Sequence, residues 1–419
     1  MTIPSETDVV VIGGGPSGST VSTLLAQHGY KVTLFERDHF PRFHIGESLI
    51  PNTYHVLKRL NMLPKLKGSH FVKKYSVQFV NERGKLSEPF YFVEHKPGEE
   101  SQTWQVRRSE FDTIMLNNAR EHGVAVHEGT RVLEVLFDND RAVGVRIQHP
   151  EEGKREVRAK VVVDASGQSS ILLDRLGLRT WDPDLKKMAL WTYWRGAYRG
   201  DGRDEGATLV LRTEGKKGWF WYIPLHDNIT SVGIVADPSE ILPNGRSEPL
   251  EQAYQRQVDR CPGLQPLIAN AERCDIFRIE KEYSYRSSQV AGNGWALVGD
   301  AFGFLDPLYS SGVLLALKSG ALAADAIAEG LAAGDVSEQR LRSWEDDYVR
   351  GINRMRRLVC EYYTGFSFGR FVHKHPHFKG FLTDLLIGDL FRDELDVLWP
   401  YMDEMRAEMD AAAAQAQGR

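Results

Sequence analysis

The chain has 419 residues, enough for two or three domains or lobes, and its 42% hydrophobic and 26% charged content is ordinary for a globular protein. A formal net charge of -5 at pH 7, with no long basic run, argues against nonspecific binding to nucleic acid. Three widely spaced cysteines suit a reducing compartment, and the apolar run near the N-terminus is too short for a signal peptide or a membrane span. We therefore expect a cytoplasmic protein with no nucleic-acid partner and no stable membrane association.

The first predicted elements form a strand–helix–strand unit over residues 9–36. An apolar strand leads into Gly13-Gly14-Gly15-Pro16-Ser17-Gly18, which fits G-x-G-x-x-G, and a helix and a second strand ending at Glu36 follow. Gly13 permits a tight turn, Gly15 lets the backbone approach a pyrophosphate, and Gly18 lets helix and strand pack closely. The helix N-terminus favours phosphates, and Glu36 is suited to accept hydrogen bonds from a ribose. A glycine-rich loop alone is usually just a turn, but here all five features coincide.

Further elements follow in chain order. They are a polar loop at 37–49, a strand at 71–80, a helix at 109–123, a buried strand at 160–167 and glycine-rich sequence at 294–312. Residues 181–285 show strand patterns and many aromatic side chains, which predicts a separate, mostly β lobe. Helical sequence continues to about residue 409, and we expect the last ten residues, rich in alanine and glutamine, to be a frayed tail.

A second cofactor signal lies at Gly294-Trp295-Ala296-Leu297-Val298-Gly299-Asp300. A buried strand here delivers Gly299 and Asp300 at its carboxyl end, where ligands bind in open α/β sheets. The acid is suited to bind a ribityl hydroxyl, while the glycine leaves space for that chain. Alone, this segment fits an ordinary strand-to-helix cap. Together with the glycine loop it indicates FAD.

The two signals together resemble the flavoprotein monooxygenase superfamily over residues 8–345. Arg108-Ser109-Glu110-Phe111-Asp112 is similar to its R-x-x-F-D segment, whose arginine lies near the flavin, and Asp164-Ala165-Ser166-Gly167 is similar to its D-A-x-G turn near the adenine half. The resemblance implies an α/β fold with a Rossmann-like FAD-binding lobe of the p-hydroxybenzoate hydroxylase type, an inserted mostly β substrate lobe and a C-terminal helical region. The residues expected to bind FAD are Gly13, Gly15, Pro16, Ser17, Gly18, Glu36, Arg37, Ile45, Gly46, Glu47, Ser48, Arg108, Asp164, Gly299, Asp300 and Gly312.

We expect three parts in the chain. These are a discontinuous FAD-binding domain of residues 1–75, 104–180 and 286–345, a β-rich substrate or cover domain of residues 76–103 and 181–285, and a helical region of residues 346–419.

The segment Trp219-Phe220-Trp221-Tyr222-Ile223-Pro224 matches W-x-W-x-I-P, the signature of flavin-dependent halogenases. The alternative is a strand with aromatic side chains on one face, since the two tryptophans are spaced by two residues. The full match inside a flavoprotein favours the first interpretation. The resemblance implies that Trp219, Trp221, Ile223 and Pro224 wall off the flavin, so that the organic substrate cannot reach it and be hydroxylated.

Lys73-Lys74 precedes Tyr75-Ser76-Val77-Gln78-Phe79-Val80-Asn81, which resembles the halogenase strand bearing the essential lysine. On that pattern Lys74 holds the essential position. Neighbouring residues of a strand face opposite ways, so at most one lysine points inward. The alternative is a solvated lysine pair. A desolvated lysine can hydrogen-bond hypochlorous acid or form a chloramine, and so orient electrophilic chlorine toward an aromatic carbon.

Asp306-Pro307-Leu308-Tyr309-Ser310-Ser311-Gly312 resembles the D/E-P-x-x-S-S/T-G segment that leads into the helix beneath the isoalloxazine ring. Ser311 and Gly312 match the place where halogenases bind halide through backbone N–H groups. Helix capping by a serine is a compatible second role. Tyr309 stands where tryptophan halogenases carry a glutamate. That departure and the shorter chain favour the branch that acts on phenols and pyrroles.

Two further features complete the prediction. Gly46-Glu47-Ser48 resembles the G-E-S/A segment beside the flavin, which is thought to relay binding between the flavin and halide sites, and a solvated surface loop is the alternative. His373, His375 and His377 alternate like metal ligands, but Pro376 interrupts them and no acid is nearby in the sequence. We therefore expect no metal.

The resemblance implies an FADH2-dependent halogenase that uses O2 and chloride or bromide to form hypohalous acid, which Lys74 directs onto an electron-rich phenol or pyrrole, free or tethered to a carrier protein. Reduced FAD is then a cosubstrate from a separate flavin reductase, because no second nucleotide-binding fingerprint appears. The alternatives are an FAD-dependent aromatic hydroxylase, a geranylgeranyl-reductase-like enzyme and a flavin-binding protein without turnover. Lys74 and the tryptophan segment discriminate in favour of the halogenase.

Overall fold

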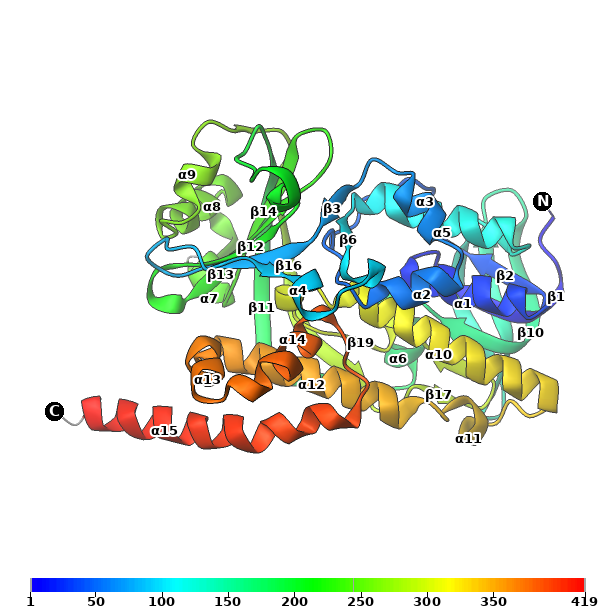
Figure 1. Cartoon of the computed structure of the whole chain (residues 1–419). Helices are drawn as coiled ribbons and strands as arrows, with labels where there is room; N and C mark the ends of the chain where they lie inside the picture. The colour runs from blue at the N-terminus through cyan, green and yellow to red at the C-terminus, as the bar shows by residue number, and fades with distance from the viewer. Residues whose placement is uncertain (1, 244, 418–419) are drawn as a thin grey trace.

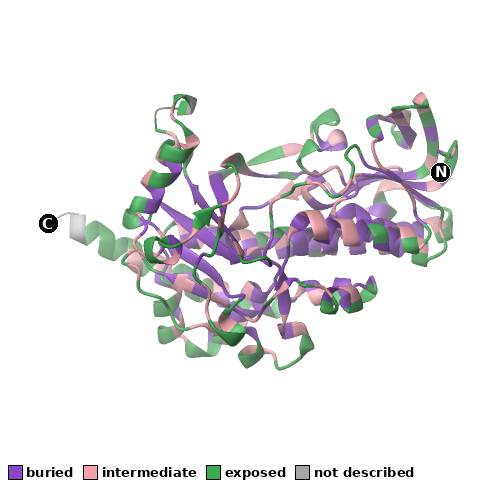
Figure 2. Ribbon diagram, turned by 90° about the horizontal axis from the view of Figure 1, so that it is seen from above, coloured by how far each residue is buried: buried purple, intermediate pink, exposed green. Residues whose placement is uncertain are grey.

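The computed structural model describes residues 2–243 and 245–417. Strands in these ranges form two large sheets and one small ribbon. Figure 1 shows the first sheet at the N-terminal side of the molecule and the second at the opposite side, with long helices running below. The strands of both sheets are largely buried, while exposed residues gather on the outer helices and loops (Figure 2).

The first sheet contains the strand–helix–strand unit predicted from the sequence. Its central strand β1 (Glu6–Ile12) runs parallel to β2 (Val32–Phe35) and to β10 (Gly153–Asp164). Both faces of a parallel sheet are normally covered, and accordingly the side chains of Val9 and Val11 are completely buried. The other strands are β7 (Ala125–His127), β8 (Arg131–Asp138), β9 (Arg141–His149), β17 (Ala291–Gly292) and β18 (Trp295–Leu297).

Two helices far apart in the sequence pack together against this sheet. A Cβ atom added to Gly320 in α10 (Gly312–Ala333) would lie 2.8 Å from the carbonyl oxygen of Ser17 in α1 (Pro16–Gln27). Only glycine permits so close an approach, which brings the N-terminus of α10 toward the glycine loop. The other helices of this half are α2 (Thr53–Arg59), α3 (Leu63–Lys67), α5 (Arg108–Glu121) and α6 (Ile171–Arg175).

The predicted aromatic-rich β lobe forms most of the second sheet. Its strand β13 is buried along its whole length, because one face packs on the main core and the other on a separate apolar cluster that includes Phe220 and Tyr222. The strands, in chain order, are β4 (Ser76–Val80), β5 (Phe90–Tyr91), β11 (Arg179–Arg195), β12 (Thr208–Arg212), β13 (Gly218–Pro224), β14 (Ile229–Ala236), β15 (Glu272–Arg273), β16 (Arg278–Ser287) and β19 (Gly303–Phe304). Short helices α7 (Pro238–Ile241), α8 (Leu250–Asp259) and α9 (Gln265–Ile268) lie beside it.

The strand predicted at 71–80 is divided at Tyr75. Its first part, β3 (Val72–Lys74), pairs antiparallel with β6 (Thr103–Gln105), and its second part, β4, joins the second sheet parallel to β12. The region between 84 and 102 contributes β5 and the short helix α4 (Phe92–His95). Lys74 therefore lies where the chain passes from the small ribbon into the second sheet.

The C-terminal part is helical, as predicted. It contains α11 (Glu338–Leu341), α12 (Glu345–Tyr363), α13 (Phe368–Lys374), α14 (Lys379–Ile387) and α15 (Trp399–Gln417), which runs along the lower edge in Figure 1. The prediction of a frayed tail is wrong up to residue 417, because the alanine-rich end has high helix propensity and continues α15. In the described ranges, no helix is long and apolar enough to cross a membrane. The domain bounds stay a prediction.

Candidate active site

The glycine loop between β1 and α1 forms a tight cradle. Gly13 has a φ of +103°, and a Cβ atom there would lie 2.4 Å from the carbonyl oxygen of Ala165. A Cβ atom at Gly18 would lie 1.9 Å from the carbonyl oxygen of Gly13. Gly15 is the N-cap of α1 and Pro16 begins the helix, so N–H groups of the first turn lack partners within it. This arrangement suits a pyrophosphate.

The acid at the end of β2 is held beside this loop. The Glu36 carboxylate accepts hydrogen bonds from the N–H groups of Gly14 at 2.7 Å and Asp38 at 2.9 Å. A ribose would therefore donate its hydrogen bonds to Glu36 carboxylate oxygens that already accept hydrogen bonds from the backbone. Arg37 is exposed and donates a hydrogen bond to the Ser169 hydroxyl at 3.2 Å.

Arg42 is a candidate cofactor residue that the sequence does not single out. Its Nη2 atom lies 3.5 Å from the place where a Cβ atom of Gly15 would stand, so its positive charge faces the glycine loop. Its Nη1 atom is 3.3 Å from the Asp112 carboxylate. The only signal in the sequence is an arginine in a polar loop, and which loop residue folds back onto the glycines depends on tertiary contacts.

The two strand-end acids differ in their surroundings. Gly299 has a φ of +62°, its N–H donates to the Ser319 hydroxyl of α10 at 2.8 Å, and a Cβ atom there would lie 2.6 Å from Ser17 Oγ in α1. Burial raises the pKa of Asp300, the next residue, to about 6. Asp164 is fully buried, and its carboxylate accepts hydrogen bonds from the N–H groups of Ser166 at 3.0 Å and Leu172 at 2.7 Å. Asp164 thus shapes its own turn, and its contact with FAD stays a prediction.

Arg108 joins the polar loop to α5. Its Nη1 atom donates to the carbonyl oxygen of Ile45 at 2.6 Å, while Nε and Nη2 donate to the two carboxylate oxygens of Asp112 at 2.8 and 3.0 Å. Gly46 has a φ of +100°, and a Cβ atom there would lie 2.9 Å from Arg108. The loop therefore closes tightly around a buried, paired guanidinium.

Ser311 and Gly312 form the N-terminus of α10. The buried Ser311 hydroxyl has no hydrogen-bond partner within the described residues, so it does not cap the helix. A Cβ atom on Gly312 would meet no atom within 4 Å, although Val313 beside it is buried. The helix end thus presents unpaired N–H groups and a free hydroxyl beside open space. These are the features of an anion site.

A line of hydrogen bonds connects the tryptophan segment with the residues before α10. Trp219 Nε1 donates to the Tyr363 hydroxyl at 2.8 Å, and that hydroxyl donates to the Asp306 carboxylate at 2.8 Å. Burial raises the pKa of Asp306 to about 6. Tyr363 belongs to α12, so the C-terminal helices fix this part of the site. Its role is invisible in the sequence, where it is one aromatic residue among several in a helix.

Trp219, Trp221, Ile223 and Pro224 are all buried in β13. Trp221 Nε1 donates to the Ser231 hydroxyl of β14 at 3.1 Å. A Cβ atom added to Gly233 would lie 2.2 Å from the Trp221 ring, so glycine makes room for the indole. The tryptophans are rigidly packed, as a wall requires.

Lys74 is the buried lysine of the pair, with 2% of its surface exposed, and Lys73 faces solvent. The solvated-pair alternative is therefore wrong for Lys74. Its ammonium donates to the Ser48 hydroxyl at 2.8 Å and to the carbonyl oxygen of Leu49 at 3.0 Å. No carboxylate in the described ranges pairs with it. Loss of hydration lowers its pKa to about 7.

Glu47 and Ser48 lie inside the protein, so the surface-loop alternative is wrong for both. Ser48, bound to Lys74, also lies 3.0 Å from the Thr208 hydroxyl of β12. Glu47 Oε1 accepts a hydrogen bond from the Tyr193 hydroxyl at 2.9 Å, while Oε2 is buried without a partner among the described residues. Burial raises the Glu47 pKa to about 7. Two consecutive loop residues thus contact Tyr193 of β11 and Lys74, respectively.

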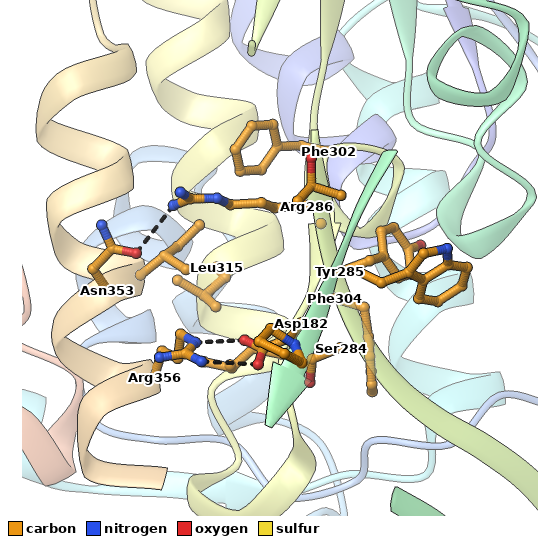
Figure 3. Close-up of a pocket in the computed structure, with 15 residues that line it drawn as sticks. Asp182, Ser284, Tyr285, Arg286, Phe302, Phe304, Leu315, Asn353 and Arg356 are labelled. Carbon is orange, nitrogen blue, oxygen red and sulfur yellow. Dashed lines mark hydrogen bonds and ion pairs between the residues drawn. The ribbon is translucent and has the colours of Figure 1, made fainter. Parts of the chain in front are cut away.

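The residues present fit FAD. The glycine cradle, Arg42, Asp300, the open space at Gly312 and the unpaired Glu47 oxygen provide places for phosphate, ribityl chain and ring. A separate cavity of about 270 Å³ lies between β11, β16 and α12 (Figure 3). None of the predicted site residues lines it. Its arginines are paired, Arg356 with Asp182 at 2.8 Å and Arg286 with Asn353 at 3.1 Å.

Comparisons with known proteins agree with this geometry. Residues 95–366 match the family model described as tryptophan halogenase, and residues 8–174 match that of FAD dependent oxidoreductases. The flavin-dependent halogenase armH3 of Armillaria mellea is 35% identical over 80% of this chain and 70% of that protein. The chlorinase of 1H-pyrrole-2-carbonyl-(peptidyl-carrier protein) from Pseudomonas fluorescens is 32% identical over 95% of this chain and 92% of that protein.

Among solved structures, the flavin-dependent brominase Bmp2 superposes with a TM-score of 0.85 and 29% identity, over 98% of this chain and 100% of that chain. The chain belongs to the flavin-dependent halogenases. It is an FAD-dependent enzyme that catalyses a halogenation and uses a halide as a substrate. The hydroxylase and geranylgeranyl-reductase alternatives are not favoured.

Proposed function

We propose that this halogenase acts on an electron-rich aromatic ring and that Lys74 delivers the halogen. One observation carries the proposal. The Lys74 amine is buried, has no carboxylate partner within the part of the chain that the structure describes, and lies where the polar loop, the small ribbon and β12 meet. A buried lysine is unfavourable for folding, and such groups concentrate at functional sites.

The Lys74 ammonium donates a hydrogen bond to the oxygen of hypohalous acid. The ring carbon attacks the halogen, the halogen–oxygen bond breaks, and the oxygen leaves as water after taking up one proton. Loss of the ring proton restores aromaticity, so hypohalous acid and arene give haloarene and water. Ser48 and the Leu49 carbonyl hold the ammonium in place.

Bound FADH2 would supply the two electrons with which O2 is activated to oxidise the halide. The chain holds the halide at the backbone N–H groups of Ser311 and Gly312 and at the Ser311 hydroxyl, which has no partner among the described residues. The packed strand with Trp219 and Trp221 excludes the organic substrate from the flavin. Glu47, on the same short segment as Ser48, couples the loop around Arg108 to Lys74.

The substrate class follows from two considerations. Tyr309 stands where tryptophan halogenases place a glutamate, and phenol and pyrrole rings are activated enough to react without that carboxylate. One relative similar over nearly its whole length is named as acting on a carrier-bound pyrrole. We infer that the substrate is a phenol or a pyrrole, either free or tethered to a carrier protein. We also infer that a separate flavin reductase supplies FADH2.

The decisive experiment combines the enzyme with a flavin reductase, halide and panels of free and carrier-loaded phenols and pyrroles, with isotope patterns read by mass spectrometry. Lys74→Ala should lose halogenated product by at least about a hundredfold while still consuming O2 in a halide-dependent way. Lys73→Ala, on the exposed side of the same strand, is the matched control and should keep full activity. A halogenated product from Lys74→Ala at the wild-type rate would overturn the role of Lys74.

A further inference from the structure

A cluster of potential metal ligands lies outside the residues assigned to the halogenation site. His70, Glu110 and His226 come from three distant segments, and one nitrogen or oxygen atom of each lies within 4.8 Å of the others. His70 Nε2 is 2.9 Å from Glu110 Oε2, and His226 Nε2 is 3.0 Å from Glu110 Oε1. The two imidazole rings meet edge to face, with centroids 4.3 Å apart.

We propose that this cluster, the His–Glu–His cluster, binds one zinc ion. Two imidazoles and a carboxylate form a ligand set that zinc uses, whereas magnesium and calcium require oxygen ligands. Neighbouring ligands on a tetrahedral zinc are separated by about 3.4 Å, given metal–ligand distances near 2.1 Å. The two histidine–glutamate separations of 2.9 and 3.0 Å, each to a different carboxylate oxygen, need only a small expansion, and the ligand atoms of all three residues already lie within 4.8 Å of one another.

Exposure of the three side chains supports entry of an ion. The His70 side chain is 68% exposed and Glu110 31%, while His226 is 7% exposed and forms the floor. Asp227, with its carboxylate 3.5 Å from His226 Nε2, can approach as a fourth ligand, and water can fill the position otherwise. Arg107 opposes the ion, because its Nη1 atom lies 3.6 Å from Glu110 Oε1.

The position of the cluster indicates what the ion would do. His70 lies two residues before the start of β3, which ends at Lys74. Glu110 lies in the first turn of α5 with Arg108, and His226 lies two residues after the end of β13. An ion held by all three would fasten the lysine strand, the arginine helix and the wall strand to one another. Its role is therefore structural, at the rim of the active site.

The proposal is tested on the full chain without flavin, reductase or substrate, so that its outcome is independent of halogenation. The protein is stripped with a chelator and titrated with zinc sulfate by calorimetry and thermal denaturation. We expect one zinc per chain, a higher melting temperature, and X-ray absorption that shows nitrogen and oxygen neighbours without sulfur. His70→Ala, at an exposed position, should weaken binding by about tenfold or more.

Three variants make the test specific. His55→Ala, an exposed histidine elsewhere, should leave zinc binding unchanged. Arg107→Gln should tighten it, because a repelling charge is removed. His375→Ala tests whether zinc binds instead at the histidines near residue 375, and it should leave zinc binding unchanged. Loss of binding in His375→Ala with none in His70→Ala would overturn the proposal, as would wild-type protein that binds no zinc in excess.

Discussion

Lys74 carries an amine in surroundings that disfavour its charge. The ordinary pKa of 10.5 falls to about 7 because the ammonium loses its water on folding. The unfolded chain therefore binds more protons than the folded chain between these two values, so protonation favours unfolding in that range. Activity and stability make opposite demands on this residue.

Replacing Lys74 with methionine should expose this conflict. Between pH 7 and pH 9 the free energy of unfolding of the wild type should rise by about 1–3 kcal/mol relative to Lys74→Met, because deprotonation removes the penalty of burying the charge. Urea denaturation at the two pH values measures the difference. The Lys73 side chain is exposed in the folded protein, so the free energy of unfolding of Lys73→Met should follow that of the wild type between the two pH values. If the difference in free energy of unfolding between the wild type and Lys74→Met were the same at both pH values, the buried amine would keep its usual affinity for protons.

Gly312 allows the anion site to be tested without damage to the fold. A methyl group there meets no protein atom within 4 Å, and alanine is about 1 kcal/mol better than glycine in a helix. Gly312→Ala should therefore melt no lower than the wild type, yet raise the KM for halide several-fold because the methyl enters the open space. Steady-state kinetics over a range of chloride concentrations, beside thermal denaturation, checks both parts. Unchanged halide dependence would place the anion elsewhere.

At the scale of elements, the proposed wall around Trp221 depends on a glycine, Gly233, in the neighbouring strand β14. Trp221 fits in β13 because β14 carries Gly233 opposite it. Gly233→Ala should lower the free energy of unfolding by about 1–3 kcal/mol, as overpacked cores do. Urea denaturation measures the loss. Gly369→Ala in α13, where a Cβ atom meets nothing within 4 Å, is the control and should not destabilise. Equal stability of the two variants would show that the wall can shift.

Local patterns predicted the elements better than their contacts. The strand–helix–strand unit and the β lobe could be read from alternation and glycine spacing, because these depend on neighbours in the sequence. For the lysine pair, alternation predicted only that at most one side chain points inward, and the family resemblance selected Lys74. The Ser48–Lys74 bond, the Tyr363 link to Trp219 and the position of Arg42 could not. Each needs the sheets to pack first, and no periodicity reports which loop atom then meets which side chain. Helix capping, the second role considered for the serine before α10, is not seen at Ser311, whose hydroxyl has no hydrogen-bond partner within the described residues.

At the scale of the whole molecule, FAD should connect the parts of the first sheet that carry the glycine loop and Asp300. Ligand at a hundred times its Kd should stabilise the wild type by about 2.7 kcal/mol. Gly15→Ala should fold, since the nearest atom to its methyl is Arg42 Nη2 at 3.5 Å, but the methyl would occupy the place of the phosphates and abolish most of the FAD-dependent shift. Thermal denaturation with and without FAD measures this. Gly68→Ala, at the end of α3, should keep the full shift, and a full shift in Gly15→Ala would mean that FAD does not contact the loop.

The parallel pairing of β4 with β12 has a consequence for how the protein is made. Val77 leaves the ribosome long before Thr208, its partner across the sheet. The segment that follows Lys74 must therefore wait, with the edge that later pairs with β12 unsatisfied, while β7, β8, β9 and β10 of the first sheet and β11 of the second are synthesised. Pairings between distant segments form slowly, and unpaired strands invite association with other chains. The nascent chain is thus vulnerable to aggregation in the interval before β12 emerges, and the surroundings of Lys74 cannot be completed until Thr208, which contacts Ser48, has been made.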